Sequence, residues 1–126
     1  MLVLDRGGFG RLSERSRKSL ALIEEFRKAG LWPPVVPTMV LVESLQGHPG
    51  RDAPANRFLK TVLKDEGVSV DVARRAAELR RRARRGSAVD ALVVVLAEPN
   101  GTVLTGDDED ITALAAVSRN VAVELI

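Results

Sequence analysis

Short runs of aliphatic residues alternate along this chain with longer segments in which apolar residues recur at helical spacing. This alternation predicts a mostly parallel β-sheet that is covered by helices. The strands are expected at residues 2–4, 35–36, 68–70, 102–104 and 121–125. The helices are expected at residues 12–29, 38–46, 53–65, 71–85, 88–97 and 108–117. The pattern therefore predicts a three-layer α/β/α sandwich on a short, mostly parallel sheet, formed by a single domain over residues 1–126.

The most apolar stretch of the chain, "DALVVVLA", has an aspartate, Asp90, at its head. Asp90 is the third residue after Ser87, which is the spacing of a capping box at a helix start, and Asp108 stands in the same relation to Thr105. Capping alone could account for both aspartates. A functional role for Asp90 has to be argued from its neighbours in the fold.

Composition narrows the classes of function. The chain has 126 residues and no cysteine, which excludes disulfides, thiolate zinc sites and cysteine nucleophiles and is consistent with the cytoplasm. It shows no signal peptide and no apolar run long enough to span a membrane, so a soluble protein is expected. With one Trp, three Phe and no Tyr, a protein that stacks single-stranded bases on aromatic side chains is not expected.

Acidic residues follow the predicted strands at the edge where open parallel sheets bind their ligands. Asp5 follows the first strand and Asp107 the fourth. Glu43 lies one turn into the helix after the second strand, and Asp90 lies in the first turn of the helix that opens at Ser87. Taken singly, Asp5 could be a polar strand end and Glu43 a half-exposed helix residue. Taken together, the four positions map to one end of the sheet.

Four carboxylates gathered at one place repel one another. A pair about 4 Å apart repels by roughly 4 kcal/mol at an effective dielectric constant of about 20, so such a cluster needs a cation or shared protons. All-oxygen ligands favour Mg²⁺ or Mn²⁺ over zinc or copper. These ions commonly meet a substrate phosphate, which indicates metal-assisted hydrolysis of phosphodiester bonds.

Four segments resemble the PIN domain in its bacterial VapC toxin branch: "LVLDRGG", "VPTMVLVESLQG", "AVDALVVVLAE" and "TVLTGDDEDITAL". They span nearly the whole chain in the order and at the spacing of that family, and the arginine- and alanine-rich style is that of an actinobacterial member. The resemblance implies the toxin of a type II toxin–antitoxin system, a Mg²⁺- or Mn²⁺-dependent endoribonuclease that cuts tRNA, rRNA or mRNA. It also implies a cognate antitoxin and a homodimer.

By the same resemblance, the family's acidic positions fall on Asp5, Glu43, Asp90 and Asp107, with Asp110 as a candidate fifth. Thr105 matches the hydroxyl residue that orients the last acid. One position departs from the pattern, because Arg6 stands where many PIN domains have a small hydroxyl residue. Arg6 could pair with Asp5 or contact the scissile phosphate, and the sequence leaves both open.

Arginines are concentrated between residues 74 and 85. Val72, Ala76, Leu79 and Ala83 form the apolar stripe of this helix, which leaves most arginines on its exposed side. That side could contact RNA phosphates, with Arg81, Arg82 and Arg85 as candidates, or could be a solvated helix face.

Two other functions compete with a nuclease. A catalytically silent PIN fold would only bind protein or RNA, and the complete set of acids argues against it. A phospho-accepting receiver domain is also a parallel α/β fold, but it needs an acidic pair after the first strand and a lysine after the last. Asp5 lacks an acidic neighbour, and the terminal "VAVELI" lacks the lysine.

Overall fold

Five parallel strands form one sheet in the order β3-β2-β1-β4-β5 in the computed structural model. The structure describes the backbone of residues 1–126 and every side chain except that of Asp108. The strands are β1 (Leu2–Leu4), β2 (Val35–Pro37), β3 (Leu63–Asp65), β4 (Thr102–Thr105) and β5 (Ala122–Leu125). β1 pairs in register with β4 on one side and with β2 on the other, so the chain builds the sheet outward in both directions from β1.

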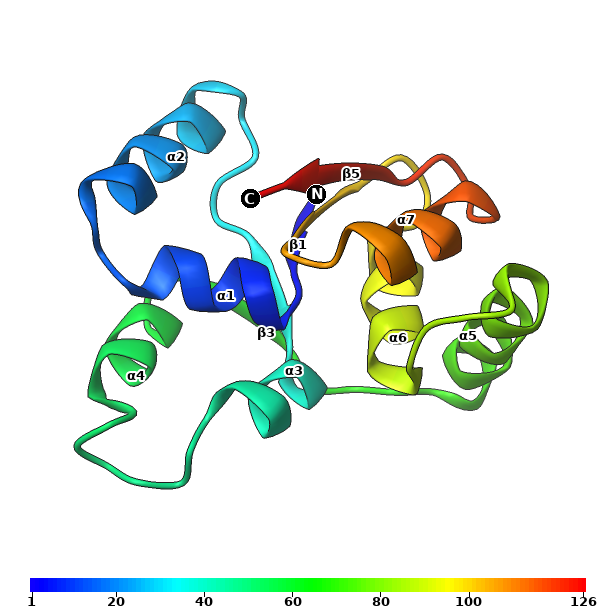
Figure 1. The fold of residues 1–126 in the computed structure, drawn as a ribbon, viewed down its shortest axis with the longest axis horizontal. Coiled ribbons are helices and arrows are strands. Elements are labelled where there is room, and N and C mark those ends of the chain that lie inside the picture. The colour runs from blue at the N-terminus through cyan, green and yellow to red at the C-terminus, as the bar shows by residue number, and fades with distance from the viewer.

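Seven helices connect the strands within the described backbone. They are α1 (Arg6–Ser13), α2 (Arg17–Lys28), α3 (Thr38–Ser44), α4 (Ala53–Leu59), α5 (Val70–Ala83), α6 (Ala88–Ala97) and α7 (Asp108–Ala116). Figure 1 shows α1, α2 and α4 on one side of the sheet and α5, α6 and α7 on the other. The predicted three-layer α/β/α sandwich, which is a PIN-like arrangement, is confirmed.

The core lies around the two central strands. Every residue of β1 is fully buried, as are Val103 and Leu104 of β4, because a parallel strand covered on both faces must be apolar on both. Helix α6 contacts β1, β2 and β4, and it is apolar on most sides since it lies between the sheet and α5. The apolar stretch behind Asp90 is therefore a core helix.

Three predicted elements are wrong in detail. Residues 12–29 form two helices instead of one, because Arg15 adopts a left-handed backbone (φ 60°) and Ser16 caps a new helix by accepting a hydrogen bond from the Ser19 N–H. The third strand lies at Leu63–Asp65, inside the predicted helix 53–65. The stretch 68–70 instead leads into α5, which Ser69 caps. Leu63 and Lys64 are exposed on an edge strand, so the burial pattern expected of a central strand is missing.

Among the residues that the structure describes, no helix is both long enough and apolar enough to span a membrane.

Candidate metal centre

A pocket of about 420 Å³ opens where the strand order reverses, beside the carboxyl ends of β1 and β4. Crevices at such positions are the usual ligand sites of open parallel sheets. The pocket is lined by Asp5, Arg6, Gly7, Glu43, Ser87, Val89, Asp90, Gly106 and Asp107. All four carboxylates expected in the site therefore border one pocket, although they come from four separate segments of the chain.

Asp5 is held rigidly between α1 and β4. It is 6% exposed and caps α1, with its Oδ1 accepting a hydrogen bond from the Gly8 N–H at 2.8 Å. A side chain on Gly8 would collide with the carbonyl oxygen of Leu104, so the glycine allows the start of α1 to lie directly against the end of β4. Burial raises the pKa of Asp5 and the charge of Asp90 adds to this, while hydrogen bonds from Thr105 and Gly8 oppose it. Burial therefore favours a neutral carboxyl group at Asp5, or one paired with a cation, over a free carboxylate.

Thr105 joins the two strand ends. Its hydroxyl donates a hydrogen bond to Asp5 Oδ2 and accepts one from the Asp107 N–H at 2.8 Å. The residue was expected to orient the last acid, and the structure shows that it contacts the first acid as well. The sequence predicted that Thr105 caps α7 in a capping box with Asp108, and this prediction is wrong. That helix is capped by Asp107, whose Oδ1 accepts from the Asp110 N–H at 3.0 Å, and the side chain of Asp108 lies outside the described residues.

Asp90 forms the predicted capping box at the start of α6. Its Oδ2 accepts from the Ser87 N–H and its own N–H donates to Ser87 Oγ, both at 3.1 Å. Only one carboxylate oxygen takes part in the cap. Because the helix behind it is buried, the backbone of Asp90 is held firmly, and the second oxygen remains available to a ligand.

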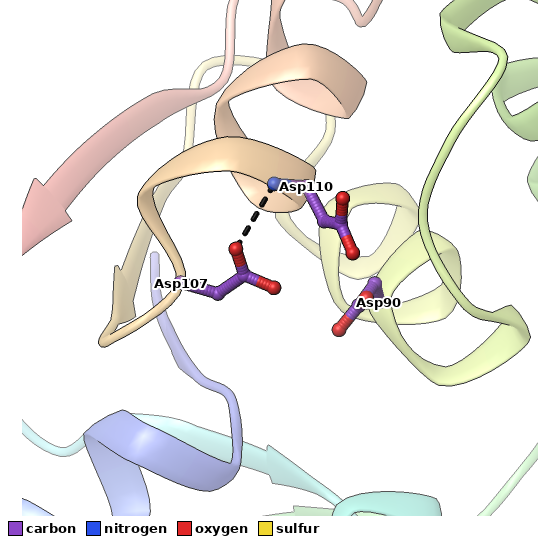
Figure 2. A group of neighbouring side chains, drawn as sticks. All are labelled: Asp90, Asp107 and Asp110. Carbon is purple, nitrogen blue, oxygen red and sulfur yellow. Dashed lines mark hydrogen bonds between the residues drawn. The ribbon is translucent and has the colours of Figure 1, made fainter.

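Three carboxylates approach one another closely enough to share an ion. One oxygen each of Asp90, Asp107 and Asp110 lies within 4.8 Å of the other two. Figure 2 shows Asp90 on α6 reaching toward Asp107 and Asp110 at the start of α7. The donors are carboxylate oxygens throughout, which suits a hard divalent cation such as Mg²⁺ or Mn²⁺. Asp107 and Asp110, which the sequence left as alternatives for the last acid, both belong to this group.

Glu43 enters the pocket from the opposite side. It is exposed near the end of the short helix α3, and the structure gives it no ion pair among the described side chains. It lines the pocket but does not belong to the group of carboxylates that lie within 4.8 Å of one another. Glu43 is therefore both an exposed helix residue and a residue that lines the pocket, so the two interpretations of its sequence position do not exclude each other.

The arginines predicted to contact RNA differ from one another in their surroundings. Arg6 is exposed at the rim of the pocket and makes no ion pair with Asp5, so the first of its two predicted roles is absent here. Arg82 donates to the Val117 carbonyl at 3.4 Å, and Arg81 is exposed. Arg85 is ion-paired with Asp110 and Glu109. Sequence spacing gave no signal for this pairing, since 25 residues separate Arg85 from Asp110.

The fold and the pocket define a class: a small α/β/α domain with a carboxylate-lined pocket at the reversal of its parallel sheet. Two solved structures are similar over nearly their whole length. The crystal structure of VapBC2 from Rickettsia felis bound to a DNA fragment from their promoter matches with a TM-score of 0.71 and 14% identity, over 99% of this chain and 98% of that one. The crystal structure of FitAcB from Neisseria gonorrhoeae matches with a TM-score of 0.61 and 17% identity, over 98% and 96%.

Both similar structures are complexes of toxin–antitoxin systems. No protein-family model and no curated protein sequence matches the chain. At 14% and 17% identity the two structures show the fold alone. The sequence-based identification of the chain as an actinobacterial member of the VapC toxin family is therefore withdrawn, because the two structures show a shared fold and not a shared family. The four motifs on which that identification depended are short segments with acidic residues at strand and helix ends. Helix capping also places acidic residues at such ends, so the motifs do not identify the family.

Proposed function

We propose that this chain is a metal-dependent endoribonuclease that acts as the nuclease of a toxin–antitoxin pair. One observation carries the proposal: Asp5, Glu43, Asp90 and Asp107 converge from four segments on a single pocket at the sheet reversal. Helix caps alone would not require these side chains to share one space. Mutual repulsion makes such a gathering costly unless the site serves a cation.

Each carboxylate would have a distinct part in holding Mg²⁺ or Mn²⁺. Asp5 and Asp90 are the principal ligand candidates, since both are fixed by backbone hydrogen bonds at helix starts. Asp107 has one oxygen engaged by the Asp110 N–H, which leaves the other to the ion. Glu43 would close the site from α3. The ion would supply positive charge that activates water for attack and stabilises charge on the phosphate.

The exposed arginines at the end of α5 support a polyanionic substrate such as RNA. An acidic pocket repels a polyanion, so a phosphodiester would approach only when a cation is bound or when flanking arginines offset the acids. Arg80, Arg81, Arg82 and Arg84 are exposed along the end of α5 and have no carboxylate partner within 4 Å among the described side chains. Exposed guanidinium groups of this kind would hold phosphates in position without choosing a base sequence.

Protein partners form the second half of the proposal. The two similar structures are of complexes, one of them bound to promoter DNA. A cognate antitoxin that covers the acidic pocket and a homodimer of this chain are the partners we propose. Purification with the product of an adjacent reading frame would test the first, and light scattering of the isolated chain would test the second.

The decisive experiment measures RNA cleavage and metal binding in parallel. The wild-type protein should cleave RNA in Mg²⁺ or Mn²⁺, and EDTA or the substitution Asp90→Asn should abolish cleavage. Calorimetric titration should show binding of Mn²⁺ to the wild type. Binding without cleavage of any RNA would refute the endoribonuclease, and the absence of both would indicate a catalytically silent binding protein.

A further inference from the structure

Arg85 follows α5 directly and pairs with two acidic residues at the start of α7. It follows the left-handed residue Arg84 (φ 58°), with which α5 ends. Its Nε donates to Asp110 Oδ1 at 2.8 Å, and a terminal nitrogen donates to Glu109 Oε2 at 2.9 Å. The guanidinium therefore bridges two carboxylates in the first turn of α7.

One of those two carboxylates also belongs to the acidic cluster. An oxygen of Asp110 lies within 4.8 Å of oxygens on Asp90 and Asp107. Arginine is always charged, so its guanidinium offsets the charge of Asp110, and it occupies one of the two carboxylate oxygens, Oδ1. While Arg85 is paired, Asp110 is a weaker ligand for any ion in the pocket.

We propose that Arg85 and a divalent ion are alternative partners of Asp110, so that Arg85 sets how tightly the pocket binds its metal. This inference rests on the proposed metal centre. Arg85 is a positioning residue in this scheme, because it acts on the ion through Asp110. When Asp110 turns to the ion, the guanidinium keeps Glu109 and has N–H groups free for a phosphate at the edge of the pocket.

The geometry permits such an exchange without a change in the backbone. The start of α7 is anchored by the hydrogen bond from the Asp110 N–H to Asp107, which leaves the side chain of Asp110 free to rotate. Arg85 is 46% exposed and the side chain of Asp110 33% exposed. Water can therefore replace the N–H donors of Arg85, and the ion pair is easily broken.

The competing interpretation is that Arg85 only fastens the end of α5 to the start of α7. The two interpretations predict different effects of Arg85→Ala. A fastening role predicts a lower melting temperature and unchanged metal affinity. Competition predicts tighter metal binding, because the substitution frees a carboxylate and removes a positive charge next to the site.

The test is a Mn²⁺ titration of the apo protein at low salt, followed by the electron paramagnetic resonance signal of free Mn²⁺. Arg85→Ala should tighten binding roughly three- to tenfold. Arg74→Ala is the matched control, because it removes an arginine of α5 whose only carboxylate partner is the exposed Asp71. Its affinity should stay within about twofold of the wild type.

Two further variants make the result specific to Asp110. Asp110→Asn alone should weaken binding by about two- to threefold, because the pocket loses a negative charge while Arg85 keeps its positive charge. Combined with Arg85→Ala, it should remove the gain in affinity. An unchanged affinity in Arg85→Ala, or a gain that persists in the double variant, would overturn the inference. A wild-type protein that binds no Mn²⁺ would instead overturn the proposed metal centre itself.

Discussion

The substitution Asp90→Asn separates the two roles of this residue. The side-chain oxygen of asparagine can still accept a hydrogen bond from the Ser87 N–H, which the carboxylate of Asp90 accepts at 3.1 Å, so the capping box can keep both of its hydrogen bonds. The charge that faces Asp107 and Asp110 is lost. We therefore expect the start of α6 to survive and the metal affinity to fall.

The magnitude follows from the spacing of the carboxylates. Oxygens at the 4.8 Å limit of this group repel by about 0.9 kcal/mol per pair at the dielectric constant of water and by about 3.5 kcal/mol at an effective value of about 20. Asp90 is only half-buried and Arg85 already offsets Asp110, so the lower figure applies. The substitution also removes the attraction between the carboxylate and the start of α6, which is about 0.3–1 kcal/mol. Without metal, Asp90→Asn should therefore stabilise the fold by no more than about 0.5 kcal/mol, which is a rise of about 2 °C in melting temperature for a domain of this size.

Thermal melts with EDTA and with Mg²⁺ measure both effects. At a Mg²⁺ concentration about ten times its Kd, the wild type should gain about 1.4 kcal/mol, and Asp90→Asn should gain almost nothing. Asp90→Ala is the control for the cap. It should be less stable than Asp90→Asn by about 0.5–1 kcal/mol in EDTA, because the box loses its acceptor. A Mg²⁺-induced shift in Asp90→Asn equal to that of the wild type would refute the assignment of Asp90 to the metal centre.

Three further predictions concern the junction of β1 and β4. Gly8→Ala should destabilise the fold by roughly 2 kcal/mol or more, measured by urea unfolding, because the new methyl group collides with the Leu104 carbonyl; an unchanged midpoint would contradict this close approach. Thr105→Val should lower the free energy of unfolding by about 1–3 kcal/mol and weaken Mn²⁺ binding, because it removes the donor to Asp5 and the acceptor of the Asp107 N–H. The control is Thr105→Ser, which keeps both hydrogen bonds and should change neither quantity. The raised pKa of Asp5, caused mainly by burial, means that the folded apo protein holds this proton more tightly than the unfolded chain. The contribution of protonated Asp5 to the free energy of unfolding is then fully present below the pKa that Asp5 has in the unfolded chain, and it is lost as the pH rises through the higher pKa that Asp5 has in the folded protein. In EDTA, the free energy of unfolding of the wild type minus that of Asp5→Asn should accordingly fall as the pH rises from the unfolded pKa through the folded pKa of Asp5. A difference that does not vary with pH would contradict this prediction.

The central part of the fold was predictable from the sequence because strong local signals agree there with the tertiary structure. The first strand and the helix behind Asp90 are buried on most sides, so their apolar runs are unbroken, and the predicted bounds 2–4 and 88–97 are those observed. The expected fourth and fifth strands differ from β4 and β5 by one residue at one end. The convergence of Asp5 and Asp107 follows from the parallel direction of β1 and β4 alone.

The periphery was not predictable for physical reasons that can be named. β3 is an edge strand of three residues with two exposed side chains, so neither alternation nor an apolar run marks it. The break between α1 and α2 depends on a left-handed arginine, Arg15, a conformation for which glycine or asparagine is the usual signal. The pairing of Arg85 with Asp110 depends on how α5 and α7 come together, which no local pattern encodes.

The acidic pocket shows why helix capping and metal binding could not be told apart in the sequence. Asp5 caps α1, Asp107 caps α7 and Asp90 completes the capping box of α6, so the starts of three helices meet at one pocket. Each helix start carries a partial positive charge that stabilises a nearby carboxylate by about 0.3–1 kcal/mol. Three such contributions partly offset the repulsion among the acids in the absence of a cation. The caps therefore let the protein fold with its acids already in place, and Asp90 and Asp107 each use one oxygen for the cap and keep the other for a ligand.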